Sequence, residues 1–300
     1  MITVYNKYEF TRWHMDNRNY NDVIKTALEM LRAHRNIVHQ ITNQVTMHDC
    51  ANIVLAIGAS PIMASHPEEV AEVTRISKAL VLNIGTIEEE VAKAMLIAAR
   101  AANDSHIPIV FDPVGVGVSR LRQQLTSTIL DSFTIGIIRC NASELQSIYT
   151  GSRSSSGVDA TSILEDGFIV DSAMAVAKRY DTVVAVTGEV DYVTDGNRVV
   201  SLHNGVDLLP QLTGTGCMTT ALTGAYLTVA EPFVAAIAGI TTMSVCGEMA
   251  AVRLSNSTQL ESTKWAMSTL GSFSVYLHDA IGDVSPDELG KRGIIKDEVK

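Results

Sequence analysis

Short, strongly apolar runs alternate along the middle of the chain with longer segments of helical spacing. The apolar runs are rich in Val and Ile and cover residues 78–86, 106–114, 135–141 and 181–188. Runs of this kind are typical of strands buried in a parallel sheet. The intervening segments at 87–104, 120–132 and 171–180 repeat their apolar residues with helical spacing. Repeated strand, helix, strand units predict a mainly parallel sheet with helices packed on it.

The pattern changes after residue 188. Residues 189–205 alternate apolar and polar positions around a central Asp-Gly-Asn turn, which predicts a β-hairpin. Three long helical segments follow, at 217–230, 231–254 and 257–281. The second is apolar nearly all round, so we expect it to be buried, against the core or against another subunit.

The first part of the chain contains further helical signals. We expect helices at 20–35, at 43–57 with Gly58 ending it, and at 66–77. Capping boxes are predicted at Ser65-x-x-Glu68 and at Thr86-x-x-Glu89, the second opening the helix at 87–104. The loop at 150–162 is the most flexible in composition, but it does not mark a domain boundary.

Composition excludes several classes of function. The chain has 300 residues, 46% hydrophobic and 19% charged, which is a globular composition. Its formal charge of −10 and the lack of a Lys/Arg run argue against a nucleic-acid partner. No 18-residue apolar run or signal sequence occurs, and the four cysteines are widely spaced. We therefore predict a cytoplasmic protein with free thiols and a small-molecule substrate.

Polar side chains follow each of the four predicted strands. They are Asn83, Asp112, Asn141 with Glu144 one turn later, and Thr187. Ligands of open parallel sheets bind beyond the carboxyl ends of the strands, so these groups are candidates for one site. Each also has a structural interpretation: Asp112 starts a turn, Asn141 and Glu144 form a capping box, and Thr187 closes a strand.

A glycine turn at residues 214–217, Gly-Thr-Gly-Cys, opens the helical segment that follows it. Unpaired amides and the positive end of the helix macrodipole favour a phosphate at such a position. The turn is neither a Walker A loop, because the lysine is missing, nor a G-x-G-x-x-G fingerprint. By itself it is a weak indication of anion binding.

Taken in order, these motifs resemble one family. "GTGC" opens a late helix after "HNG", and "ITNQVTMHDCANIVLAIGASPIMA", "LVLNIGT", "PIVFDPVGVG", "RCNASEL", "GVDA", "AVTGEVDYV" and "LGSFSVYL" occur elsewhere. The chain resembles hydroxyethylthiazole kinase of the ribokinase-like superfamily from about residue 37 to 281. The resemblance implies one three-layer α/β/α domain over 21–300, with a mainly parallel central sheet, the hairpin and a helical C-terminal part. Residues 1–20 fall outside it and are predicted to be a disordered lead.

The same resemblance implies an activity. It is phosphoryl transfer from Mg-ATP to the hydroxyl of 4-methyl-5-(2-hydroxyethyl)thiazole, in thiamine biosynthesis and salvage, by a homotrimer with its sites at subunit interfaces. Two alternatives are another ribokinase-like kinase, acting on hydroxymethylpyrimidine or pyridoxal, and a trimer that binds thiazole or nucleotide without catalysis. Those other kinases are expected to have an aspartate after the glycine turn and to lack the "ASPIM" stretch, whereas this chain has Cys217 and "ASPIM".

The resemblance also implies roles for individual residues, each of which has a structural alternative. The substrate-binding residues would be Met63, Gly214 and Asn43; the nucleotide-binding residues Arg122, Thr187, Thr215 and Gly216; the Mg2+ ligands Asp112 and Glu144; and the catalytic residue Cys217. From motif evidence alone, Arg122 is a solvated helix charge, Asn43 a helix cap and Met63 core filler.

Cys217 stands where most ribokinase-like enzymes place an aspartate that acts as base. The thiol pKa, ordinarily about 8.5, can fall at a helix N-terminus, which would let a thiolate accept the hydroxyl proton. A neighbouring phosphate opposes that shift. Cys217 is therefore either a general base or a group that only orients the alcohol, and a covalent intermediate is not needed.

Overall fold

The computed structural model describes residues 19–151, 166–258 and 269–298. One nine-stranded sheet runs through it in the order β2-β1-β3-β4-β5-β6-β7-β8-β9. The strands are β1 (Ile37–Ile41), β2 (Ser60–Ile62), β3 (Ala79–Asn83), β4 (Ile109–Asp112), β5 (Ile137–Asn141), β6 (Val183–Thr187), β7 (Asp191–Thr194), β8 (Val199–Leu202) and β9 (Ile295–Glu298). Strands β1 to β6 run parallel to one another. The pairs β6–β7, β7–β8 and β8–β9 are antiparallel.

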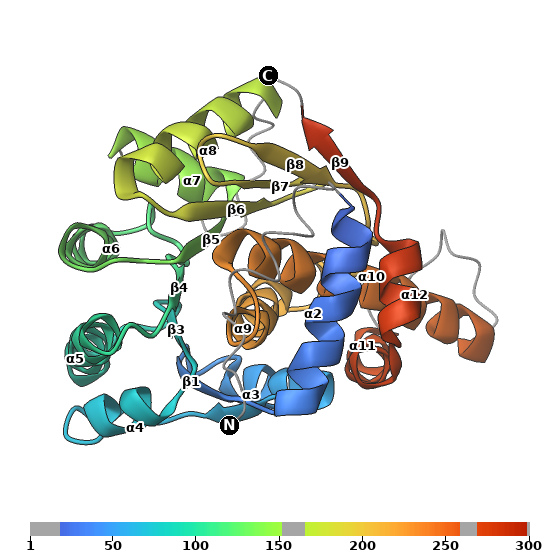
Figure 1. Cartoon of the computed structure of the whole chain (residues 1–300), viewed down its shortest axis with the longest axis horizontal. Coiled ribbons are helices and arrows are strands. Elements are labelled where there is room, and N and C mark those ends of the chain that lie inside the picture. Colours follow the sequence, from blue (N-terminus) through green and yellow to red (C-terminus); the bar gives the residue numbers. More distant parts are fainter. Residues whose placement is uncertain (1–18, 152–165, 259–268, 299–300) are drawn as a thin grey trace, which may run out of the picture.

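Helices cover both faces of the sheet, so the expected three-layer architecture is confirmed (Figure 1). One face carries α4 (Val70–Ile76), α5 (Glu89–Asp104), α6 (Arg120–Ser132), α7 (Ala142–Thr150) and α8 (Asp166–Tyr180). The other carries α2 (Tyr20–His34), α3 (Met47–Ile57), α9 (Thr215–Leu227), α10 (Pro232–Thr258), α11 (Leu270–Asp283) and α12 (Pro286–Arg292). Because strand side chains alternate, Val81 faces the α9 core, whereas Leu80 and Leu82 face the α5 core.

The four strands expected from apolar runs are confirmed as β3 to β6, and the hairpin is confirmed as β7 and β8. Strands β1, β2 and β9 were not expected. The sequence of β1, Ile-Val-His-Gln-Ile, interrupts its apolar run with two polar residues, and β2 has three residues with a central proline. Each strand takes its place from pairing with a neighbour rather than from its own pattern.

Helix starts differ from expectation where a cap was inferred from sequence. The box at Asn141 and Glu144 is present, but the N-cap residues of α4 and α5 are Glu69 and Glu88, and neither makes a side-chain cap hydrogen bond. The Thr86 hydroxyl instead accepts a hydrogen bond from the backbone amide of Gln44, 3.0 Å away. Helix α3 ends at Gly58 as expected, yet it begins at residue 47, because residues 42–46 form a turn that belongs to the site described below.

Helices α9 and α10 form the buried centre of the second helical layer. Helix α10 has the length and hydropathy of a membrane span, but 89% of its most apolar window is buried inside the structure. Its apolarity is therefore that of a core helix, and a neighbouring subunit is not needed to cover it. The expected third segment is α11, shorter than predicted, with residues 259–268 outside the described part; the loop at 150–162 also falls largely outside it.

Candidate active site

The glycine turn leads into α9 at the carboxyl edge of the parallel strands. Gly214 is the N-cap residue with φ 90°, and a Cβ there would overlap the Thr46 side chain, so only glycine fits. The first intrahelical bond runs from the Met218 amide to the Gly214 carbonyl. Within the described residues, the amides of 215–217 have no hydrogen-bond partner. They form an anion-binding helix terminus.

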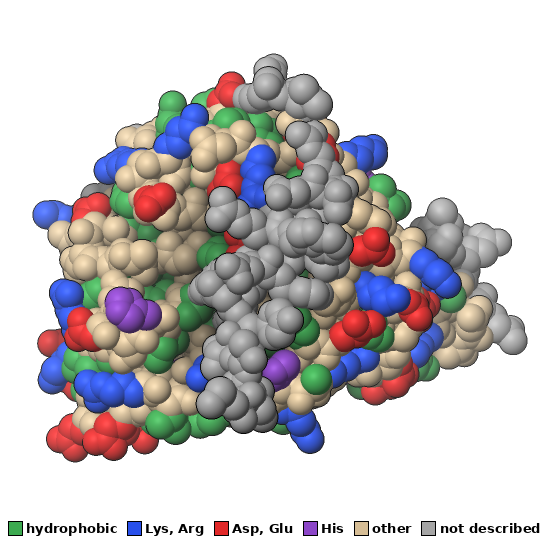
Figure 2. Space-filling view, viewed as in Figure 1, with side chains coloured by type: hydrophobic (Ala, Val, Ile, Leu, Met, Phe, Trp, Pro, Cys, Tyr) green, Lys and Arg blue, Asp and Glu red, His purple; other side chains and the backbone are tan. Residues whose placement is uncertain are grey.

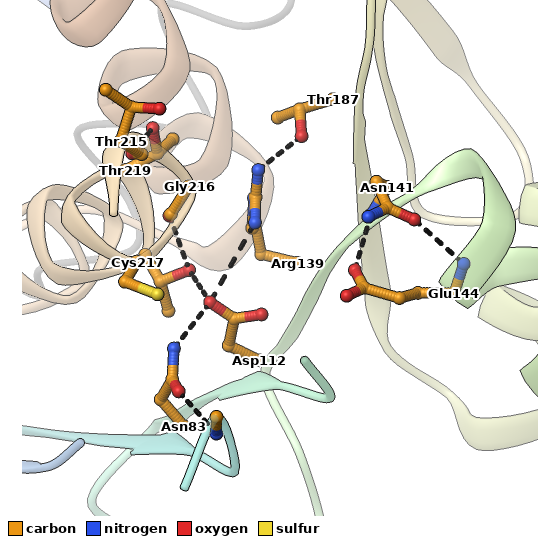
Figure 3. Close-up of polar contacts among 12 residues, drawn as sticks. Asn83, Asp112, Arg139, Asn141, Glu144, Thr187, Thr215, Gly216, Cys217 and Thr219 are labelled. Atoms are coloured by element: carbon orange, nitrogen blue, oxygen red, sulfur yellow. Dashed lines mark hydrogen bonds and ion pairs between the residues drawn. The ribbon is translucent and has the colours of Figure 1, made fainter. Parts of the chain in front are cut away.

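Asp112, at the end of β4, is fully buried beneath this helix start. Its Oδ2 accepts hydrogen bonds from Asn83 Nδ2 at 2.9 Å and from Thr220 Oγ1 at 2.6 Å, which connects β3, β4 and α9. Its Oδ1 is buried and has no partner among the described residues. The carboxylate therefore keeps one acceptor atom unused, the oxygen that no dashed line reaches in Figure 3.

Arg139 on β5 stands at one of the strand ends that the sequence marked, but it was given no role there. Its side chain is only 10% exposed, and Nη2 donates a hydrogen bond to Thr187 Oγ1 while Nη1 lies 3.9 Å from Asp112 Oδ2. A Cβ on Gly216 would lie 2.7 Å from Nη1, so the absence of a side chain there admits the guanidinium against the first turn of α9 (Figure 3). A charged residue within an apolar strand was the sequence signal for it.

Burial dominates the electrostatics of this cluster. It raises the pKa of Asp112, despite the opposing effect of Arg139. Burial, followed by the charge of Asp112, raises the pKa of Glu144 to about 7. For Arg139 burial acts to lower the pKa, but the neighbouring carboxylates of Asp112 and Glu144 outweigh it, so the guanidinium stays charged. A buried cation thus stands at the positive end of a helix, where an anion would stabilise both.

Glu144 lies on α7 and is committed to the backbone. Oε1 accepts from the Gly115 amide and Oε2 from the Asn141 amide, each at 2.8 Å. In Figure 3 it points toward Asn141, apart from the group around Asp112. The capping box expected from the sequence is therefore present. Any metal contact would use the remaining lone pairs of the same two oxygens.

Cys217 is in the first turn of α9, where Asn43 holds it. Asn43 Nδ2 lies 3.2 Å from Cys217 Sγ and 3.1 Å from Asn83 Oδ1. Asn43 Oδ1 in turn accepts from both the amide and the hydroxyl of Thr46. Asn43 thus caps the turn before α3 rather than the helix itself, whose N-cap residue is Thr46, and it also connects the thiol to the strand end.

The expected fall in the Cys217 thiol pKa is wrong in direction. The pKa is raised, first because the thiol is buried and next because the charge of Asp112 disfavours a thiolate. Hydrogen bonds and Arg139 oppose this shift without reversing it. The thiol of the substrate-free protein is therefore protonated at neutral pH, which favours the orienting role over the general base.

Arg122 has different partners from those that its predicted role would require. Its Nη1 donates to the carbonyls of Ile84 and Val114, at 2.5 and 2.7 Å, and its Nη2 donates to the carbonyl of Gly85 at 2.7 Å. These bonds connect the loops that follow β3 and β4. The guanidinium supports the site's outer loops, and its role in phosphate binding stays a prediction.

The remaining predicted residues surround the same edge. Met63, just after β2, is half-buried and packs against the α9 core. The Thr215 hydroxyl donates to the carbonyls of Leu209 and Leu212, so only its amide faces a ligand. The structure thus brings Asn43, Asp112, Thr187 and residues 214–217 together, while Arg122 on α6 and Glu144 on α7 are bonded to the adjoining loops.

A separate cavity of about 520 Å3 lies away from this edge. It is lined by residues of the loop after β8 and by the C-terminal half of α10, among them Val206, Asp207, Glu248 and Val252. None of the predicted site residues lines it. Figure 2 shows acidic and basic side chains interspersed on the displayed face, so the net negative charge is not gathered there into one pole.

The oxygen donors at this edge are of the type that Mg2+ binds, but they are few. Mg2+ takes oxygen ligands, keeps several waters and is held by one or two carboxylates together with substrate phosphates. The unused Oδ1 of Asp112 and the carboxylate of Glu144 supply that type of ligand. In the described part of the chain no three His, Cys, Asp or Glu side chains converge on one point. The donors therefore suit a metal that arrives with phosphate better than a resident one.

The comparisons with known proteins agree with this geometry. Residues 28–287 match the model of the hydroxyethylthiazole kinase family. A hydroxyethylthiazole kinase of Ruminiclostridium cellulolyticum is 46% identical over 77% of this chain and 85% of its own, and one of Clostridium beijerinckii is 40% identical over 91% and 97%.

Solved structures give the same result. The hydroxyethylthiazole kinase of Pyrococcus horikoshii OT3 superposes with a TM-score of 0.79 at 33% identity, covering 92% of this chain and 99% of its own. A pyridoxal kinase of Staphylococcus aureus, solved with AMP-PCP and pyridoxal, gives a TM-score of 0.53 at 14% identity, covering 70% and 86%. The second likeness extends to the fold alone.

Proposed function

The chain belongs to the hydroxyethylthiazole kinase family, and from that membership we infer that it transfers the γ-phosphoryl group of ATP to the hydroxyl of 4-methyl-5-(2-hydroxyethyl)thiazole, a step of thiamine salvage. The observation that carries the inference is the family match over residues 28–287, joined to an anion-binding helix start beside a buried arginine. The likeness to pyridoxal kinases is confined to the fold, and the expected aspartate of those enzymes is Cys217 here.

Positioning and charge neutralisation are what phosphoryl transfer asks of a protein. The free amides of 215–217 and the Arg139 guanidinium would bind the oxygens of the transferring group, and the Thr187 hydroxyl, fixed by Arg139, would bind a neighbouring phosphate. The protonated Cys217 thiol, held by Asn43, would orient the substrate hydroxyl toward that group. Met63 and Gly214 would line the thiazole pocket.

Magnesium is proposed as the partner of the nucleotide. Asp112 Oδ1 and the Glu144 carboxylate are the groups that would hold it. Bound there with the phosphates, it would neutralise charge that develops on the transferring group. The chain's own contribution is to keep both carboxylates dry and fixed by hydrogen bonds from Asn83, Thr220 and two backbone amides.

We also propose one catalytic domain over residues 21–300, a cytoplasmic location, and a homotrimer whose sites lie at subunit interfaces. The domain proposal is supported by the single sheet, which joins strands from β1 near the start of the described residues to β9 at their end. Val45, only two residues beyond Asn43, is 68% exposed, and Leu55 on α3 is 52% exposed. Exposed apolar side chains of this kind are suited to burial against a neighbouring subunit, which at Val45 would lie beside the site.

The test is incubation of the purified protein with Mg-ATP and the thiazole alcohol. We expect equimolar ADP and thiazole phosphate ester, resolved by chromatography. Parallel reactions with hydroxymethylpyrimidine and pyridoxal should give a kcat/KM lower by at least about 100-fold. A higher kcat/KM for either would reassign the substrate, and tight thiazole binding without ADP formation would support the non-catalytic alternative.

A further inference from the structure

His39 is a buried histidine that the proposed chemistry does not use. It lies on β1, opposite Ile62 of β2 in the ladder, and is 0% exposed. Its neighbours in the strand divide between the two cores: Val38 belongs to the α9 core and Ile41 to the α5 core. Since side chains alternate, His39 points with Ile41 away from α9 and from the catalytic face.

Both imidazole nitrogens are hydrogen-bonded. Nε2 lies 2.9 Å from the Ala64 carbonyl oxygen and Nδ1 lies 2.9 Å from Thr74 Oγ1 on α4. A carbonyl only accepts, so Nε2 carries a proton. Burial lowers the pKa of the imidazole and so favours the neutral ring, in which Nδ1 accepts from the Thr74 hydroxyl.

The bond to Ala64 lies just beyond the end of a strand. The ladder between β1 and β2 ends at the His39 and Ile62 pair, and the chain continues through Met63 to Ala64. Met63 is half-buried, packs against the α9 core and is the residue that we propose contacts the thiazole. Where the ladder stops, the imidazole therefore takes over and fixes the peptide that follows Met63.

We propose that His39 is the positioning residue of the thiazole subsite: through its hydrogen bond to the Ala64 carbonyl it sets the place of Met63, and so the affinity for the heterocycle. The proposal rests on the proposed function, because it takes Met63 as a thiazole contact. Displacement of a contact group by about 1 Å is enough to weaken a substrate complex severely. Thr74 bonds the other ring nitrogen, a contact that stabilises the fold and is not needed for the bond to Ala64.

Two conservative variants separate the two bonds of the ring. In His39→Gln the side-chain amide reaches the place of Nε2 and keeps the donor to Ala64. In His39→Asn it reaches only the place of Nδ1 and keeps the contact with Thr74. Both replace a buried ring by a smaller polar group, so their effects on folding should be alike, and they differ in the bond that the proposal requires.

Steady-state kinetics with each substrate varied in turn tests the idea. We expect His39→Asn to raise the KM for the thiazole about tenfold, with the KM for ATP within about twofold of the parent. We expect both KM values of His39→Gln to stay within about threefold of those of the parent. Equal thiazole KM values for the two variants, or a parallel rise in the KM for ATP, would overturn the proposal.

Met63→Ala and Thr74→Val complete the design. If Met63→Ala leaves the thiazole KM unchanged, the proposed pocket is wrong; if it raises that KM while His39→Asn does not, the pocket stands and the positioning role fails. Thr74→Val, which keeps the Ala64 bond, should lower the melting temperature with both KM values within about threefold. Should His39→Asn not fold, a tenfold rise in thiazole KM for Thr74→Val would count against the assignment to Ala64.

Discussion

Arg139 and Arg122 carry the same charge but have different partners. Arg139 is buried beside Asp112 and lies against the start of α9, where it completes an anion site. Arg122 donates to three backbone carbonyls, so its guanidinium is already used in holding two loops. The family resemblance gave the role of nucleotide binding to Arg122. The position of Arg139 suits that role better.

Alanine substitution of each arginine distinguishes the two. Arg139→Ala removes charge from the phosphate site, so we expect the KM for ATP to rise at least tenfold and the KM for the thiazole to change less than threefold. Arg122→Ala leaves three carbonyls without their donor, so we expect a melting temperature several degrees lower and similar changes in both KM values. Kinetics and thermal unfolding measure these effects. A selective rise in the KM for ATP in Arg122→Ala would restore the original assignment.

At Cys217, substitution by aspartate tests whether the thiol is needed as such. The structure places the thiol beside Asn43, where a carboxylate could also accept the hydroxyl proton. We expect Cys217→Asp to keep or raise kcat, and Cys217→Ala to lower it by about tenfold or more. A folded Cys217→Asp variant without any turnover would reject both the base and the orienting role.

Asp191 shows how a buried carboxyl changes stability with pH. Burial raises its pKa to about 7, although the Gly188 amide at 2.9 Å and Arg139 oppose the shift. The folded-state pKa exceeds the unfolded value of about 3.9, so the stability that this group contributes is complete below about pH 4 and is lost as the pH rises through 7. The ionised carboxylate is thus a cost to the folded state at pH 8.

Replacement of Asp191 by asparagine keeps an acceptor for the Gly188 amide and removes the charge. We expect Asp191→Asn to raise the free energy of unfolding more at pH 8 than at pH 5.5, by on the order of 2 kcal/mol, because the carboxylate of the parent ionises in the folded state between these two values. Urea unfolding of the substrate-free protein at the two pH values measures the difference. The same change at both values would mean that Asp191 is not protonated on folding.

At the scale of elements, the start of α9 determines the site. The helix needs glycine at 214 for a positive φ and at 216 for the approach of Arg139. Its first turn presents free amides, and Thr220 in its second turn donates to Asp112. One helix thus joins the anion site to the end of β4.

A methyl group at residue 216 should disturb the site more than the fold. In Gly216→Ala the new Cβ would lie 2.7 Å from Arg139 Nη1 and displace the guanidinium, so we expect kcat/KM for ATP to fall at least tenfold with the melting temperature nearly unchanged. The matched control is Gly271→Ala in α11, where a Cβ meets nothing within 4 Å. That change should leave kinetics unaltered and stabilise by about 0.5 to 1 kcal/mol. Equal activity in both variants would contradict the close approach.

At the scale of the whole molecule, both cores close within one chain. Helix α10 is buried by the rest of the chain, so the proposed trimer would be formed by other surfaces. Val45 is exposed in the turn that carries Asn43, and Leu55 is exposed in the last turn of α3. Assembly through these residues would bury Val45 only two residues from Asn43.

Light scattering during size-exclusion chromatography tests the assembly. We expect three times the chain mass of 32.3 kDa. Val45→Asp with Leu55→Asp should shift the mass toward the monomer and raise the KM for the thiazole, because the pocket would lose a wall. The matched control, Val118→Asp, changes an apolar residue that is 48% exposed in the loop between β4 and α6, and it should leave the trimer intact. A fully active parent of monomer mass would refute sites shared between subunits.

The sequence by itself determined the parallel sheet, the hairpin, the long apolar helices and the glycine turn, because these depend on local periodicity and on residues with special backbone freedom. It did not determine β1, β2 and β9, whose strands are made by pairing with distant segments. Nor could it separate Arg139 from Arg122 or give the sign of the Cys217 pKa shift. Those depend on which groups burial brings together and how much water it removes from them, and only the tertiary structure decides that.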